Sequence, residues 1–250
     1  MKRLAAALAT VLMLSLFALG QQPQTPAVAP SMRSDLYHVH FVKAAPGKTR
    51  ELLESLKTPA PNAPMPGHVL LLRHLQGDEW DFVAIEHLGT RAMIEATGGP
   101  TPARELRAWH NDTYATGPAW ADFVKAMGMT ATPGAQDKSV YIVSTYRGAP
   151  GHRAQLEQSL NRVTAASRRP GESILLQHSE GSPWDYLYIS HFNSWQDFAA
   201  QQDDPEAEGR ERRAGFTQSP GLELREHMAA HHDTITDRIP LPAAPAQPPR

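Results

Sequence analysis

The sequence contains no cysteine. This absence excludes disulfide bonds, thiolate metal sites, a lipid anchor on cysteine and the thioether attachment of haem. An oxidising compartment is permitted, but the chain forms no covalent cross-link there. The folded protein is therefore held together by its noncovalent core alone.

The sequence also lacks an excess of positive charge. It has 24 Lys and Arg residues against 26 Asp and Glu residues, for a formal net charge of -2 at pH 7. Such a balance gives no basic footprint for nucleic acid or for an anionic membrane surface. We therefore expect a small-molecule ligand or another protein as the partner, and no nucleic acid.

Long apolar runs are absent after the N-terminus. Lys2 and Arg3 precede an uncharged apolar run from Leu4 to Leu19, and a Gln-rich stretch follows. This three-part pattern is typical of a secretory signal peptide, and the run is short for a membrane helix of about 20 residues. We expect removal of residues 1–20 and a periplasmic or secreted protein with no membrane span.

Residues 21–34 and 239–250 are rich in Pro, Ala and Gln. Segments of this composition bury too little apolar surface to offset the loss of chain entropy, so we predict that both are disordered. The predicted folded region contains a first unit over 35–130, a linker over 131–138 and a second unit over 139–238.

The two predicted units repeat each other. The segment "GDEWDFVAIEHL" (77–88) has a near copy in "GSPWDYLYISHF" (181–192), and an offset of 104 aligns 36–88 with 140–192 without a gap. Further on, "RELRAWHNDT" (104–113) matches "REHMAAHHDT" (225–234), so the second half carries an insertion around "DDPEAEGRERRAGFTQSPG". The pattern indicates a tandem duplication.

Each half shows the same order of local patterns. "LYHVHFV" and "VYIVSTY" alternate as strands do, a Pro-Gly turn and an amphipathic helix follow, and two further strands form a hairpin. "RELRAWH" and "LELREHMAAHH" then predict the end of a helical region, with a last short strand from Asp112 or Asp233. The order β-α-β-β-α-β is that of a ferredoxin-like unit. We therefore predict an α+β fold, in which two tandem ferredoxin-like repeats pack their sheets into a pseudo-dimeric barrel within a monomer.

The segment "VYIVSTYRGAPGHRAQLEQSL", followed by a hairpin, resembles the dimeric α+β barrel superfamily. This superfamily includes NIPSNAP-like and antibiotic-biosynthesis-monooxygenase-like proteins. The resemblance implies a barrel that serves cofactor-free oxygenases, haem-degrading enzymes, haem-dependent chlorite-dismutase-like enzymes and ligand-binding regulators. No catalytic motif of these groups carries over to individual residues, and the fold does not choose among them.

Alternation along the strands separates an aliphatic face from a more polar face. We assign the aliphatic face to a helix-covered core and predict that the other face lines a lumen between the two sheets. A small apolar or aromatic ligand would bind there, because pockets combine apolar walls with a few polar groups. The predicted ligand-binding residues are His38, Phe82, Tyr146, Gln177, Tyr186 and Tyr188, with Ser190 also on this face.

The predicted catalytic residues are His40, Glu86 and Arg73. With the first and third strands as parallel neighbours, Glu86 would lie beside His40, and the two would handle a proton while Arg73 stabilises an anion. In the alternative interpretation, His38 and His40 are partly exposed strand residues and Glu86 pairs with Arg73.

No cofactor is required by the sequence, although haem or a divalent metal remains open. His38 and His40 have the i, i+2 spacing of a metal pair on a strand, and His227 and His231 have the i, i+4 spacing of one on a helix. No spacing identifies a third ligand. From the sequence we expect a protein that binds a small ligand. The alternatives are a cofactor-free or haem-linked oxygenase and a non-catalytic structural or interaction protein.

The repeated Trp-Asp segment favours a scaffold role in both copies. We expect Trp80 and Trp184 to cover the sheet edges and Asp81 and Asp185 to cap the hairpin turns. The histidines after them would tie each strand end to the following loop. His110 and His231 are expected at helix C-termini, where a cation is favoured.

Overall fold

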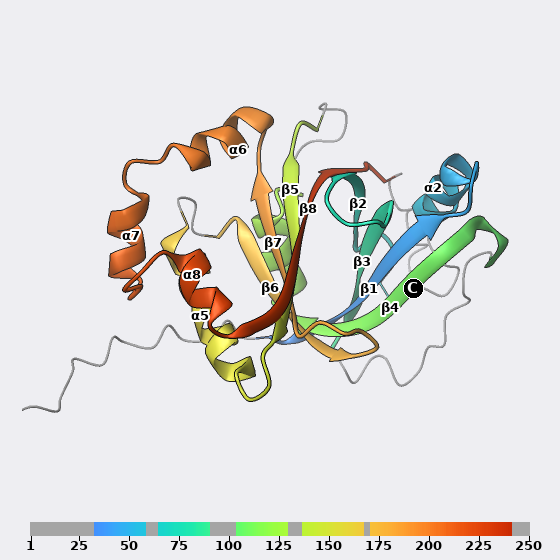
Figure 1. Cartoon of the computed structure of the whole chain (residues 1–250). Helices are drawn as coiled ribbons and strands as arrows, with labels where there is room; N and C mark the ends of the chain where they lie inside the picture. The colour runs from blue at the N-terminus through green and yellow to red at the C-terminus, as the bar shows by residue number, and fades with distance from the viewer. Residues whose placement is uncertain (1–32, 59–64, 91–103, 130–136, 168–170, 242–250) are drawn as a thin grey trace, which may run out of the picture.

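A computed structural model describes residues 33–58, 65–90, 104–129, 137–167 and 171–241. The predicted signal peptide and most of the two predicted disordered segments lie outside these ranges. Within them, the strands form one closed barrel in the order β1-β3-β2-β8-β5-β7-β6-β4 (Figure 1). No helix among the described residues is both long and apolar enough to span a membrane.

The elements alternate along the chain in an α+β pattern. The strands are β1 (Asp35–Ala44), β2 (Val69–Gln76), β3 (Phe82–Gly89), β4 (Arg107–Gly117), β5 (Val140–Gly148), β6 (Ser173–Glu180), β7 (Tyr186–Phe192) and β8 (Met228–Arg238). The helices are α2 (Thr49–Lys57), the 3-10 turn η1 (Arg104–Leu106), α4 (Trp120–Ala126), α5 (Arg153–Ala166), α6 (Trp195–Gln202), α7 (Ala207–Arg213) and α8 (Pro220–Arg225). The predicted second helical region of the first half falls largely on 91–103, outside the described residues.

Two seams close the barrel, because the last strand of each half pairs with the second strand of the other half. At the β4–β6 seam Ala115 lies opposite His178, and at the β2–β8 seam His74 lies opposite Thr236. The alignment of the two halves of the sequence matches His74 with His178 and Ala115 with Thr236, so the two pairs correspond. The seams are therefore equivalent, and neither half closes a barrel alone.

Two hairpin glycines sit against these seams. Gly77, at φ 135°, and Gly181, at φ 101°, both adopt backbone conformations that L side chains rarely take. A Cβ on Gly77 would lie 2.5 Å from the carbonyl oxygen of Asp233, and a Cβ on Gly181 would lie 2.5 Å from that of Asp112. The close approach of each hairpin to the other half thus requires glycine.

The barrel interior is filled by the aliphatic faces of both sheets. One continuous core cluster joins the two halves, with Tyr37, Val39, Leu70, Leu72, Val83, Ile85, Trp80, Tyr141, Val143, Leu176, Trp184, Leu187 and Ile189 among its members. The prediction that the aliphatic face lies under helices was therefore wrong, since these aliphatic side chains meet inside the barrel. The interior of a closed barrel is the region most shielded from water, so burying the most apolar face there gains the most free energy.

The outer face of the barrel carries two smaller clusters under helices. In the first half α2 packs on Val42, Leu71 and Phe82. In the second half α5 and α8 pack on a surface made of Tyr146, Leu175, Tyr186 and Tyr188. Figure 1 shows α5, α6, α7 and α8 gathered on one side of the barrel and α2 on the other. The predicted aromatic ligand residues thus lie outside the lumen, buried under helices.

The repeated Asp and His residues tie neighbouring strands together. Asp81 and Asp185 accept hydrogen bonds from the backbone N–H groups of Ala44 and Gly148, at 2.7 and 2.8 Å. These bonds cap the ends of β1 and β5, so the prediction that the carboxylates cap their own hairpin turns was wrong.

His87 contacts Asp35 at 2.9 Å, and His191 contacts Ser139 at 3.2 Å. Both partners lie at or just before the start of the adjacent strand. Each histidine thus links its strand to the start of a neighbouring strand, and the loop that follows His87 lies largely on 91–103, outside the described residues.

The strands β4 and β8 begin earlier than predicted. Residues 107–110 and 228–232 continue as strand, because β4 pairs with β1 from Arg107 to Gly117 and β8 pairs with β5 from Met228 to Asp237. The predicted helix there was wrong, as was the helical His227–His231 pair. This extension places His110 and Asp112 on one face of a strand, beside β1.

Candidate functional site

A cluster of ionisable side chains lies on the outer face of β1, β3 and β4. β1 runs antiparallel to both of its neighbours, and the predicted parallel pairing with β3 was wrong. In this register His38 lies opposite Glu86, and His40 lies opposite Asp112. The chain therefore brings Glu86 to His38, whereas the sequence predicted that it meets His40.

Asp112 is the centre of this cluster. Its Oδ1 lies 3.2 Å from Nε2 of His38 and 3.7 Å from Nε2 of His40, and its Oδ2 lies 2.9 Å from Nδ1 of His110. His38 also donates from Nδ1 to Oε2 of Glu86 at 3.0 Å. One carboxylate is thus shared by three imidazoles, and a second carboxylate orients one of them.

His40 is the most buried member of the cluster, with 6% of its surface exposed. Its Nε2 is buried and has no hydrogen-bond partner among the described residues. A buried polar atom without a partner costs about 1–3 kcal/mol, so native structures contain few of them. The three ligand atoms of His40, His110 and Asp112 lie within 4.8 Å of one another.

The electrostatics of the cluster give the side chains of His38, His40 and Asp112 different charges at neutral pH. Burial lowers the pKa of His38, but its hydrogen bonds to Asp112 and Glu86 outweigh this effect and raise the pKa to about 9. Burial lowers the pKa of His40 to about 4. The hydrogen bond from His38 lowers the pKa of Asp112 to about 2. His38 is therefore a cation, His40 is neutral and Asp112 is a carboxylate. General bases work best with a pKa near the working pH, so His40 is poorly matched to its predicted role.

Two predicted site residues lie elsewhere. Arg73 donates from Nε to Asp237 at 3.0 Å, across the β2–β8 seam, so it pairs neither with the cluster nor with Glu86. Gln177 accepts a hydrogen bond from Arg33 at 3.1 Å. Neither residue is brought to the histidines by the fold.

The second half carries only part of this arrangement. His231 contacts Asp233 at 2.8 Å, in the positions that correspond to His110 and Asp112. Ser144 stands where the first half has His40, and its hydroxyl donates to Asp233 at 2.6 Å. Ile142 and Ser190 correspond to His38 and Glu86. Within the described ranges, the arrangement of two imidazoles and a carboxylate suited to a metal occurs only in the first half.

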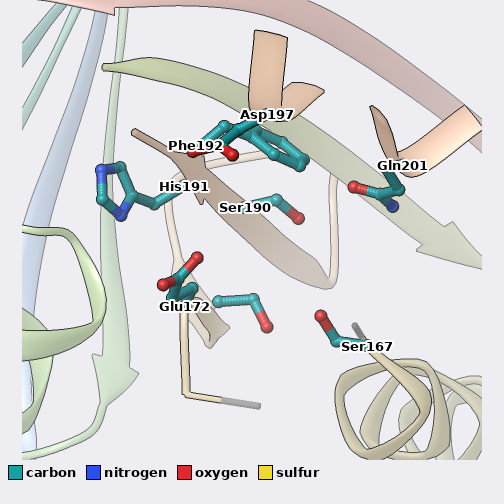
Figure 2. A pocket seen from close by; sticks show the side chains of 8 residues that line it. Ser167, Glu172, Ser190, His191, Phe192, Asp197 and Gln201 are labelled. Carbon is teal, nitrogen blue, oxygen red and sulfur yellow. The ribbon is translucent and has the colours of Figure 1, made fainter. Parts of the chain in front are cut away.

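A small hollow lies over Ser190 in the second half, between β6, β7 and α6. Its lining is Ser167, Glu172, Ser173, Ser190, His191, Phe192, Asp197 and Gln201 (Figure 2). The cavity volume of about 30 Å³ is above the roughly 10–15 Å³ that one water molecule needs and far below the roughly 150 Å³ of a cavity that takes up benzene. The hollow can thus hold a water molecule but not an organic ligand.

Sequence reasoning missed Asp112 and His110 as members of the site. Both were assigned to a helix end and a turn, although the spacing "H-x-D" places two side chains on one face of a strand. The available signal was the alternation of outward His110 and Asp112 with inward Thr113 and Ala115, which are fully buried.

No family model matches the sequence, and no curated protein gives a significant match. Solved structures do match the fold. A structure of an anthrone oxidase-like protein aligns with a TM-score of 0.57 at 11% identity, covering 85% of this chain and 94% of its own. A proposed monooxygenase from Fusobacterium nucleatum subsp. nucleatum aligns with a TM-score of 0.51 at 7% identity, covering 82% and 92%. The chain therefore shares the α+β barrel fold of these two structures.

Proposed function

We propose that this chain binds a small aromatic molecule on the outer face of the first half of the barrel, against His38, Glu86 and Asp112. The observation that carries the proposal is the asymmetry between the halves. The interior side chains correspond closely, whereas the ionisable cluster occurs in only one half of the described residues. Burying the imidazole of His40 costs free energy that packing does not require, since Ser144 stands at the corresponding position, so its presence in one half favours a functional role.

The chemistry of the cluster favours a ligand with an anionic or phenolic oxygen. His38 offers N–H groups on the outer face, and an oxygen that accepts from it would compete with the half-exposed carboxylates of Glu86 and Asp112. The ring of Tyr114 lies 5.6 Å from that of His38 and is 38% exposed, which offers a surface for an aromatic ring. A phenol or enol fits both features.

Oxygenation of such a phenol is the second candidate function, favoured by the alignment with the anthrone oxidase-like protein. In the reaction C14H10O + O2 → C14H8O2 + H2O, a carboxylate such as Glu86 would take the carbon-bound proton. The carbanion would reduce O2 and form a C–O bond, and the resulting hydroperoxide would lose water to give the quinone. His38 would stabilise the enolate oxygen.

The proposal includes three features of the whole chain. We infer a tandem duplication from the repeated sequence and the two equivalent seams, and a monomeric state because the barrel closes within one chain. We infer export to the periplasm or the medium from the pattern of residues 1–20. N-terminal sequencing of the mature protein and light scattering test the last two.

Binding of 2-naphthol and turnover of anthrone test the site. We expect 2-naphthol, followed by its fluorescence, to bind the wild type and to bind the double variant His38→Ile, Glu86→Ser at least tenfold more weakly. These changes install the residues of the second half. The control His231→Ala, in the corresponding part of the second half, should bind as the wild type does. Equal binding by the wild type and the double variant would place the ligand elsewhere. Anthraquinone formation by the wild type alone would support the oxygenase.

A further inference from the structure

We propose that His40, His110 and Asp112 bind a divalent transition-metal ion of the iron-to-zinc series. This proposal deepens the proposed function and rests on it for one point, which is that the functional site lies at this cluster. Metal binding can nevertheless be measured without any organic ligand. The ligand atoms are Nε2 of His40, Nδ1 of His110 and a carboxylate oxygen of Asp112.

The separations of these atoms approach those of ligands on one shared ion. Imidazole nitrogen and carboxylate oxygen bind such ions at about 2.0–2.2 Å, so two ligands at about 90–110° lie about 3.0–3.4 Å apart. In this chain Nδ1 of His110 lies 2.9 Å from Oδ2 of Asp112, Nε2 of His40 lies 3.7 Å from Oδ1 of the same carboxylate, and one ligand atom from each of the three residues falls within 4.8 Å of the others. Side-chain rotations must bring one carboxylate oxygen to both nitrogens and close the widest separation, at most 4.8 Å, by up to about 1.4 Å.

The environment of His40 supplies an independent observation. The residue is 6% exposed, and its Nε2 has no hydrogen-bond partner among the described residues. That atom points toward Asp112, at a distance longer than a hydrogen bond. A metal ion would engage the lone pair that the described protein atoms leave unengaged. At the corresponding position of the second half, Ser144 bonds directly to Asp233, and no such atom remains.

The residues around the cluster hold the carboxylate in place. His38 connects Glu86 to Asp112, in an arrangement typical of the outer partners that orient metal ligands. Arg107 and His38 place positive charge near His40, which opposes the binding of a cation. We therefore expect a dissociation constant in the micromolar range, weaker than that of a closed structural zinc site.

The donor set indicates what the ion could do. Two imidazoles and one carboxylate leave coordination positions free for water, dioxygen or a substrate oxygen. The partly exposed His110 and Asp112, with side chains 39% and 41% exposed, provide access from solvent. A metal at this place would bind the oxygen of the phenolic ligand proposed above, within reach of His38.

Calorimetric titration of the mature chain, purified without a His tag and treated with EDTA, tests the site. With Zn²⁺ and Co²⁺ we expect one equivalent to bind the wild type, and the absorption spectrum of the Co²⁺ form to report mixed nitrogen and oxygen ligands. His40→Ser and His110→Ala should each weaken binding at least tenfold. His110 is partly exposed, so its replacement keeps the test valid if the buried His40→Ser variant fails to fold.

Two matched controls exclude other histidines. His231→Ala removes the counterpart of His110 in the second half, and His227→Ala breaks the exposed pair in which Nδ1 of His152 and Nδ1 of His227 are 3.1 Å apart. Both should bind metal as the wild type does. Absence of stoichiometric binding, or equal weakening in the controls, would overturn the metal site. Metal binding without 2-naphthol binding would leave it standing and refute the proposed function.

Discussion

Replacing Gly181 by alanine should destabilise the protein more than its backbone angle alone explains. At positive φ an L side chain costs about 1–2 kcal/mol. The added Cβ would also lie 2.5 Å from the carbonyl oxygen of Asp112, where ordinary contact begins near 3.4 Å. Since the atom it meets is backbone in a paired strand, the β4–β6 seam must shift by about 0.5–1 Å, and we expect a total loss of about 3 kcal/mol.

Urea unfolding of three variants separates the two contributions. Gly47→Ala has φ 75° and no atom within 4 Å of its new Cβ, so it should lose only the conformational term of about 1–2 kcal/mol. Gly77→Ala meets Asp233 at 2.5 Å and should lose as much as Gly181→Ala, because the seams are equivalent. If either seam variant is no less stable than Gly47→Ala, the hairpins do not approach the opposite strands as described.

The two seam variants should differ in one respect. Gly181 packs on the backbone of Asp112, the centre of the histidine cluster, whereas Gly77 packs on Asp233 in the half that has Ser144. Gly181→Ala should therefore weaken the binding of Co²⁺, and Gly77→Ala should leave it unchanged. Equal effects of the two variants on Co²⁺ binding would show that the β4–β6 seam does not position Asp112 in the cluster.

Two further predictions concern stability. Trp80→Ala and Trp184→Ala should each lower the free energy of unfolding by about 3–5 kcal/mol, because both rings are buried in the barrel core. The half-exposed Trp195 is the control, and a loss of 2-naphthol binding at unchanged stability would contradict the scaffold role. The pKa of His38 is raised from 6.5 to about 9 on folding, so its stabilisation is complete below about pH 6.5 and is lost as the pH rises through about 9. In EDTA the wild type should lose about 1–2 kcal/mol more than His38→Ile between about pH 6 and about pH 10, allowing for solvent around the partly exposed carboxylates. Parallel pH profiles would show that His38 does not gain its two partners on folding.

The sequence predicts the strands well because alternation is a local property. Val39, Val83 and Ile85 mark apolar faces without knowledge of their neighbours. Which partner covers such a face is a nonlocal question. In this chain both faces of each sheet are largely buried, so the pattern identified the more apolar face but could not tell lumen from helix.

The candidate site depends even more on nonlocal pairing. Glu86 meets His38 because β1 and β3 are antiparallel, and the register between them does not appear in either strand alone. Asp112 joins the cluster because β4 pairs with β1 along its whole length, although the preceding "RELRAWH" has the composition of a helix. His38 and His40 were predicted on the more polar face of β1, whereas His110 and the carboxylate of Asp112 that the histidines share were missed.

At the two equivalent seams, each half supplies the strand that pairs with the second strand of the other half. A substitution at His74 acts on Thr236, and one at His178 acts on Ala115, so a change at a seam position of one half is met by the other half. The outer faces of β1 and β5 do not take part in the seams. The first half can therefore carry a buried histidine, His40, where the second half carries Ser144, while the same seams close the barrel.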